Sequence, residues 1–265
     1  MEEAMKLQQL LSLVRQAVED YQMIEEGDCI AVGVSGGKDS LALLYALAKL
    51  RTFYPKRFQL KAITVDLGFS GSEYAQIGRL CESMEIPYTI VTTKIAEILF
   101  QIRKEEHPCS LCSKLRKGAL NEEAIRLGCN KIAYAHHKED AMETMLMSLL
   151  YEGRFHSFSP VTYLEKSCLT VIRPLLYVNE ADIVGFKNRQ QLPILKNPCP
   201  ADGVTKRETI KQLIRTLQKE TPGVKKRLFH AVQSLPDWSR KDHFAASEEE
   251  DSGAEGDDSS GWKTS

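Results

Sequence analysis

The sequence predicts an α/β fold in which helices cover both faces of a doubly wound parallel sheet. Short apolar runs typical of strands alternate with helical patterns along most of the chain. The segments between these runs are long enough for the crossovers that parallel pairing needs. A glycine-rich loop joins one strand run to a helix, and ligands approach such sheets at this kind of junction. With 265 residues, 43% of them hydrophobic, the chain can form one large domain or one domain with an appendage.

Each element follows from its local pattern. Apolar residues at helical spacing predict an amphipathic helix over 4–24, as part of the core or as a dimer contact. Strands are expected at 31–34, 58–66, 87–91 and 131–135, and helices at 41–50, 72–84, 95–104, from the Cys109–Cys112 segment to about 127, and 139–150. Runs at 161–163 and 169–172 predict a hairpin or an edge strand. A capped helix at 179–191 and two helical stretches within 206–240 follow.

The glycine-rich loop has the composition of an anion site. It consists of Ser35, Gly36, Gly37, Lys38, Asp39 and Ser40. The two glycines allow a sharp turn and the close approach of a ligand. The loop opens a helix, whose free N–H groups and dipole favour phosphate, and Lys38 adds a positive charge. The spacing matches neither a Walker A loop nor G-x-G-x-x-G. An ordinary glycine-rich turn is the alternative, but it gives no reason for the Lys and the Asp.

Two cysteines, Cys109 and Cys112, have the Cys-x-x-Cys spacing that places two thiolates on one metal. The flanking bases Lys114, Arg116 and Lys117 are expected to lower the thiol pKa values. Two ligands do not complete a metal site, so a third is expected. Cys199 is the candidate because it lies in the rigid, non-helical stretch Asn-Pro-Cys-Pro. A thioredoxin-like redox pair or a zinc half-site remain alternatives, although a redox pair would follow the first strand of a βαβ unit.

The other four cysteines are expected to be plain core or surface thiols. An odd total of seven cysteines in a chain of this length fits reduced thiols better than a disulfide scaffold. The N-terminus shows no secretory signal, and no apolar run approaches the roughly 18 residues that span a bilayer. A cytoplasmic protein without a membrane partner is therefore expected.

Several motifs together carry a family resemblance. The loop Ser-Gly-Gly-Lys-Asp-Ser resembles the PP-loop of ATP pyrophosphatases, which split ATP between the α and β phosphates. With Pro-Cys-Ser-Leu-Cys-Ser-Lys-Leu-Arg-Lys-Gly, Ala-His-His-Lys-Glu-Asp (135–140) and Ile-Arg-Pro-Leu (172–175), the chain resembles the TtcA family of tRNA 2-thiocytidine synthetases over about 20–235. Ala135 and Glu139 stand where that family has Gly and Asp, and the Cys199 segment has a single cysteine.

The resemblance implies a cofactor set and a reaction. ATP and Mg²⁺ would adenylate C2 of an anticodon-loop cytidine. Exogenous sulfur, carried by a [4Fe–4S] cluster that Cys109, Cys112 and Cys199 hold with its fourth iron open, would then replace the oxygen to give 2-thiocytidine. Implied partners are tRNA and a sulfur donor such as a cysteine desulfurase persulfide, and a homodimer is left open. The alternatives are a lysidine synthetase-like enzyme, a thiouridine synthetase, or a non-catalytic protein that binds RNA or metal.

Three residues are assigned catalytic roles, each with a plainer alternative. Asp39 is expected to orient the nucleotide or the metal. Asp140 is a candidate Mg²⁺ or substrate ligand, or a carboxylate that only stabilises a helix dipole. Arg116, four residues after Cys112, faces the site or solvent.

The remaining candidates are assigned by the same resemblance. It implies that segment 135–140 lines the nucleotide site through His136 or His137. The alternative is that one of the two caps a helix and the other is packed. Asp66, at the end of a strand, is expected near the adenine or ribose, or is a turn residue. Arg173 is assigned to a phosphate or to a surface salt bridge.

Charge and composition predict the domain organisation. We expect an N-terminal helix (1–26), a PP-loop ATPase domain with the inserted Cys-x-x-Cys (27–200), basic helices (201–241) and a disordered acidic tail (242–265). The block 206–240 holds nine bases and three acids, which suits an RNA backbone or a solvated helix face. The net charge is −1, but it becomes +5 without residues 247–265, a balance that favours a polyanionic partner.

Overall fold

The chain folds around a mixed sheet. We describe it from a computed structural model that covers residues 6–69, 73–103, 105, 108–196, 198–199 and 206–238. Within these residues the sheet has six strands in the order β3-β2-β1-β4-β6-β5. The strands are β1 (Cys29–Gly33), β2 (Gln59–Asp66), β3 (Tyr88–Thr92), β4 (Lys131–Ala133), β5 (Val161–Leu164) and β6 (Leu169–Ile172).

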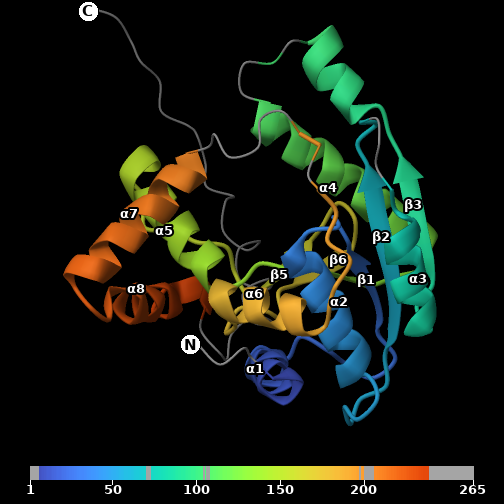
Figure 1. Cartoon of the computed structure of the whole chain (residues 1–265), viewed down its shortest axis with the longest axis horizontal. Helices are drawn as coiled ribbons and strands as arrows, with labels where there is room; N and C mark the ends of the chain where they lie inside the picture. Colours follow the sequence, from blue (N-terminus) through green and yellow to red (C-terminus); the bar gives the residue numbers. More distant parts are fainter. Residues whose placement is uncertain are drawn as a thin grey trace, which may run out of the picture.

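The strand pairing confirms the predicted fold class. β1 pairs in parallel with both β2 and β4, while β3 and β6 continue the parallel arrangement on either side. Only β5 is antiparallel, as one arm of the hairpin that was expected at this position. The strand order reverses between β1 and β4 (Figure 1). Such a reversal opens a crevice at the carboxyl ends of the strands, where ligands bind in sheets of this kind.

Helices occupy nearly the positions that the sequence predicts. They are α1 (Leu7–Asp20), α2 (Lys38–Leu50), α3 (Ala75–Ser83), α4 (Pro108–Arg126), α5 (Lys138–Glu152), α6 (Glu180–Arg189), α7 (Lys206–Glu220) and α8 (Val224–Gln233). Two short elements complete the set, the π-helical η1 (Glu97–Ile102) and the 3₁₀ turn η2 (Pro236–Trp238). The helix expected at 95–104 is therefore mainly π-helical. Among the described residues, no helix combines the length and the apolar character that crossing a membrane requires.

Side chains alternate between the two faces of the sheet, as the period of a strand requires. Ile30 and Val32 of β1 join the large core beneath α1, α2 and α6, whereas Ala31 points to the opposite face. There it meets Leu120 and Ala124 of α4. The carboxyl edge of the sheet thus lies between the N-termini of α2 and α4, where the predicted loop and the two cysteines begin.

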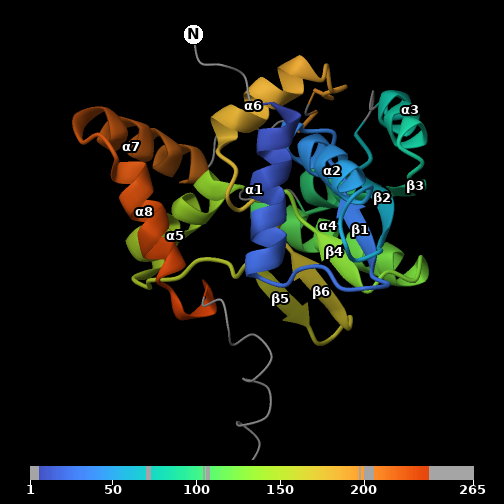
Figure 2. The same ribbon diagram turned by 90° about the horizontal axis from the view of Figure 1, so that it is seen from below.

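The stripe predicted on the N-terminal helix belongs to the core. Leu10, Val14 and Val18 of α1 are fully buried within the chain, next to α2 (Figure 2). α7 and α8 pack against α5 to one side of the sheet (Figure 1). The predicted domain boundaries stay a prediction, and the acidic tail lies outside the described residues.

Candidate functional site

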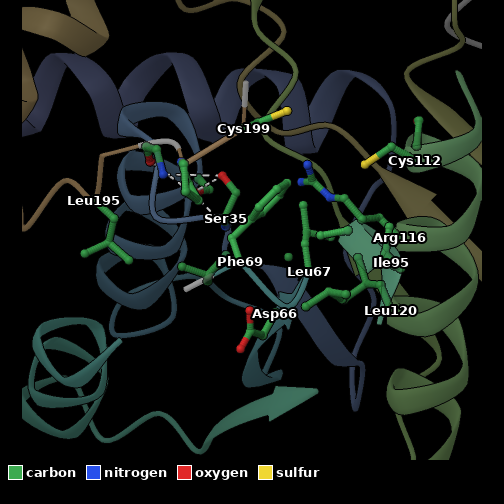
Figure 3. Close-up of a pocket in the computed structure, with 18 of the residues that line it drawn as sticks. Ser35, Asp66, Leu67, Phe69, Ile95, Cys112, Arg116, Leu120, Leu195 and Cys199 are labelled. Carbon is green, nitrogen blue, oxygen red and sulfur yellow. Dashed lines mark hydrogen bonds between the residues drawn. The ribbon is translucent and has the colours of Figure 1, made fainter. Parts of the chain in front are cut away.

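A cavity of about 870 Å³ lies at the carboxyl edge of the sheet and gathers most of the predicted site residues. Its lining includes Ser35, Gly37, Asp39, Ser40, Asp66, Cys109, Cys112, Arg116, His136, Asp140 and Cys199. Figure 3 shows the loop residue Ser35 on one side of this cavity and Cys112 with Arg116 on the other. The volume falls within the usual range for a small-molecule or cofactor site.

The loop is held in shape by its own serines. The hydroxyl of Ser40 donates to the carbonyl of Gly37 at 2.9 Å and accepts from the N–H of Ser35 at 3.2 Å. Gly37 is the N-cap of α2, so the first N–H groups of that helix open toward the loop. This arrangement can bind an anion, as the residue types predicted.

Gly36 needs to be glycine for two reasons. Its φ of +82° lies in the left-handed region, and a Cβ there would come within 2.9 Å of the Leu195 side chain. The N–H of Leu195 also donates to the carbonyl of Gly36 at 2.9 Å. The segment that leads to Cys199 is therefore fixed against the loop.

Lys38 is not among the residues that line the cavity. Its ammonium lies 2.9 Å from each carboxylate oxygen of Asp39 and 3.2 Å from Glu180. Its predicted contact with phosphate stays a prediction, and it requires the side chain to move.

Asp66 ends β2 at the cavity wall, and its carboxylate makes turn contacts. Oδ1 accepts hydrogen bonds from the N–H of Gly68 at 3.0 Å and from the hydroxyl of Tyr74 at 3.2 Å. These are the contacts of a turn residue, and the predicted adenine or ribose contact remains untested.

The two adjacent histidines have different positions. His136 lines the cavity and stacks on Phe158, with ring centroids 4.8 Å apart. His137 is the N-cap of α5, and its N–H donates to Asp140 at 2.9 Å. The plainer alternative of one packed and one capping histidine thus describes both residues, although His136 also faces the cavity.

The imidazole of His137 lies among three carboxylates. Its Nε2 is 3.5 Å from Asp140 and 3.9 Å from Asp39, and its Nδ1 is 3.4 Å from Glu139. Burial opposes the charge on His137, but these carboxylates raise its pKa overall. Burial likewise opposes the charge on Glu139, yet hydrogen bonding to His137 helps to lower its pKa to about 2. The two catalytic candidates Asp39 and Asp140 therefore lie near an imidazole whose protonated form they favour.

His136 gives a pH-dependent prediction. Burial, reinforced by Arg173, lowers its pKa from 6.5 to about 3. As pH falls below 6.5, the unfolded chain takes up this proton first, so the folded state loses stability. At about pH 5 the loss should be about 2 kcal/mol relative to about pH 7.5. Urea unfolding at both pH values should show that His136→Phe, which can still stack on Phe158, removes this loss. An equal loss in the variant would contradict the assignment.

The three predicted metal ligands face one cavity from two segments. Pro108, Cys109 and Cys112 are the first, second and fifth residues of α4, so both cysteines lie at the start of the helix that the sequence predicts here. Cys199 comes from the segment that follows Leu195, and Figure 3 shows its sulfur near that of Cys112, on which it acts electrostatically. Within the described ranges, no three His, Cys, Asp or Glu side chains are gathered closely enough to hold a metal ion as they stand.

Two electrostatic expectations are wrong. Burial raises the pKa of Cys112, and the nearby sulfurs of Cys199 and Cys109 add to the rise, which outweighs the lowering by Arg116. Arg173 is neither a surface residue nor part of a salt bridge in the described structure, so the salt-bridge alternative is wrong, while its contact with a phosphate stays a prediction. It is 8% exposed, donates to the Ser159 carbonyl and to Thr162, and lies over the Phe158 ring.

The sequence reasoning missed several residues of the cavity wall. Phe69 lies three residues after the end of β2, and Tyr134 follows β4 directly. Both come just after a strand, at the edge where ligands bind, and this position was the available signal. Lys117 also lines the cavity, and burial together with Arg173 lowers its pKa.

Comparison with known proteins places this geometry in a class. The family model of the PP-loop domain matches residues 5–217. The strand–loop–helix site therefore defines a PP-loop protein. A tRNA-cytidine(32) 2-sulfurtransferase of Geotalea uraniireducens is 39% identical over 225 residues, which cover 84% of this chain and 89% of that protein. A second, from Pelobacter propionicus, is 38% identical over 238 residues, which cover 89% of this chain and 88% of that protein. The chain belongs to this family of PP-loop transferases, the TtcA family.

A solved structure has a similar fold. The U34-tRNA thiolase NcsA from Methanococcus maripaludis, determined with its [4Fe–4S] cluster, superposes with a TM-score of 0.69. The match covers 84% of this chain and 76% of that one at 24% identity. At this identity the likeness concerns the fold.

Proposed function

We propose that the protein is an ATP-dependent tRNA sulfurtransferase that converts an anticodon-loop cytidine, at position 32 as in its named relatives, into 2-thiocytidine. One observation carries the proposal. The phosphate-binding type of loop and the three cysteines line the same cavity. A reaction that activates an oxygen with ATP and then replaces it with sulfur needs both sets of groups within reach of one base.

The ATP half of the reaction uses the loop and two carboxylates. The N–H groups at the start of α2 would hold the phosphates. The C2 oxygen of the cytosine then forms a bond to the α-phosphorus, and the bond from that phosphorus to pyrophosphate breaks. Asp39 and Asp140 would hold Mg²⁺, which neutralises charge that develops on the phosphates. AMP is then attached to C2 as a good leaving group.

The cysteine half fits a [4Fe–4S] cluster by its donor set. Three thiols, on Cys109, Cys112 and Cys199, face one cavity, and thiolates are the usual ligands of such clusters. When bound, the cluster would supply the sulfur that displaces AMP from C2. Arg116 lines the cavity one helical turn after Cys112, so its charge would stabilise the departing phosphate.

The basic helices would contact the tRNA backbone. Lys211, Arg207 and Lys225 are partly buried and pair with acids of α5 and α6. Other bases on these two helices are exposed to solvent, namely Lys206, Arg215, Lys219, Lys226 and Arg227. We assign these to RNA phosphates, which supply most sequence-independent affinity.

The test is a thiolation assay under anaerobic conditions. Protein with iron and sulfide, ATP, Mg²⁺ and hydrosulfide is incubated with a tRNA transcript, and its nucleosides are analysed by mass spectrometry. We expect 2-thiocytidine together with AMP. We expect no product with Asp39→Asn, and none from a transcript with uridine at position 32.

Other products would indicate other functions. Thiouridine would mean that the target base is a uridine, as the name U34-tRNA thiolase states for NcsA. A lysine adduct would mean lysidine synthesis. RNA binding without AMP release would favour a non-catalytic protein. Each of these results would overturn the proposed function.

A further inference from the structure

Glu180 connects the loop to the basic helix α7. It is the first residue of α6, and its N–H donates to Glu139 at 2.9 Å. The ammonium groups of Lys38 and Lys211 lie 3.2 and 2.7 Å from the same carboxylate oxygen, Oε1. The side chains of Glu180, Lys38 and Lys211 are 20%, 26% and 24% exposed, so solvent screens these pairs only in part.

The ammonium of Lys38 is held by two acids, by Asp39 at 2.9 Å and by Glu180 at 3.2 Å. Asp39 and Ser40, which follow it, line the cavity, but Lys38 itself does not. To reach a phosphate in the loop, its ammonium must leave Glu180. Lys211 competes with Lys38 for the same oxygen and therefore weakens the contact that holds Lys38 back.

We propose that Glu180 is a positioning residue that holds Lys38 out of the cavity until ATP binds, and that Lys211 of α7 sets how firmly it does so. This inference rests on the proposed use of ATP. When phosphate draws Lys38 into the loop, Glu180 pairs with Lys211 alone. ATP binding then strengthens the contact between α6 and α7. Since coupling between binding sites is reciprocal, the position of α7 also changes the affinity for ATP.

Two substitutions should change ATP affinity in opposite directions. Glu180→Gln removes one of the two carboxylates that hold Lys38 and leaves Asp39 in contact with it. It should tighten binding about two- to fivefold, the range expected for partly exposed ion pairs. In Lys211→Gln, Glu180 pairs only with Lys38, so it holds Lys38 more firmly, and the affinity for ATP should fall by a similar factor. The double variant should bind like Glu180→Gln, because Lys211 acts only through Glu180.

Isothermal titration with α,β-methylene-ATP, which cannot be split at the α–β bridge, measures these affinities without RNA. Asp182→Asn removes the same charge from the same turn of α6, and Arg189→Gln removes an exposed positive charge from the last turn of that helix. Both controls should bind like the wild type. General damage to the site would weaken binding in every variant, so the opposite signs separate positioning from damage. Lys211→Gln, at a partly exposed side chain, keeps the proposal testable if Glu180→Gln fails to fold.

Weaker or unchanged binding by Glu180→Gln would overturn the inference, and so would additive effects in the double variant. Absence of binding by the wild type would overturn it together with the ATP site. Wild-type ATP binding without any thiolated product would overturn the proposed function. The affinities of the variants would still test the roles of Lys38, Glu180 and Lys211.

Discussion

Gly36→Ala is expected to reduce ATP affinity by at least about tenfold and to disturb the cysteine side of the cavity. The φ of +82° alone costs a residue with a Cβ about 1–2 kcal/mol. The new methyl group would also lie 2.9 Å from Leu195 carbons, so either the loop or segment 192–196 must shift. Because the loop binds through backbone N–H groups, a shift of its backbone directly removes phosphate contacts.

Titration with α,β-methylene-ATP and urea unfolding measure the two effects of Gly36→Ala. We expect the free energy of unfolding to fall by about 1–3 kcal/mol, with iron retention reduced because Cys199 follows the displaced segment. Gly118→Ala is the matched control. Gly118 lies in α4 with open space around it, and alanine is the better helix former by about 0.5–1 kcal/mol. Normal ATP binding by Gly36→Ala would contradict the role given to the loop.

Cys112→Ser should abolish iron binding and thiolation while ATP binding stays within about twofold. A serine hydroxyl is a poor ligand for iron–sulfur clusters, and the two remaining thiols cannot complete the site. Anaerobically purified wild type should be brown, with about four irons and four sulfides per chain. The variant should be colourless, with less than about one iron.

Cys168→Ser is the control for a general loss of thiols. Cys168 is exposed in the turn between β5 and β6 and does not line the cavity. Its substitution should leave the colour, the iron content and the product unchanged. Colourless wild-type protein that carries zinc would instead make the three cysteines a structural site. The reaction would then have to be a different adenylation.

The sequence predicts those features of the fold and site that depend on neighbouring residues. The alternation of strands and helices is local, and so is the Ser35–Ser40 loop, because backbone turns and helix starts are set by a few adjacent residues. These features place the loop, Asp66, His136 and Asp140 at one edge of a parallel sheet.

Features that depend on distant contacts were not predictable in this way. Lys38 forms an ion pair with Glu180, which lies 142 positions later in the chain. Arg173 is buried by the packing of Phe158 and the β5–β6 hairpin, and neither contact leaves a periodic pattern. Burial raises the pKa of Cys112, and the basic residues that neighbour it in the sequence give no sign of this burial.

The hydrogen bond from Leu195 to Gly36 makes the segment before Cys199 a short tether with a fixed anchor. Four residues of extended chain reach about 13–14 Å, so Cys199 cannot lie farther than this from Leu195. The length of this segment thus limits the distance between the ATP-binding loop and the cysteine proposed as the third metal ligand. An insertion after Leu195 would raise that limit without disturbing the sheet. Chimeric enzymes built from relatives should therefore exchange the loop and this tether as one unit.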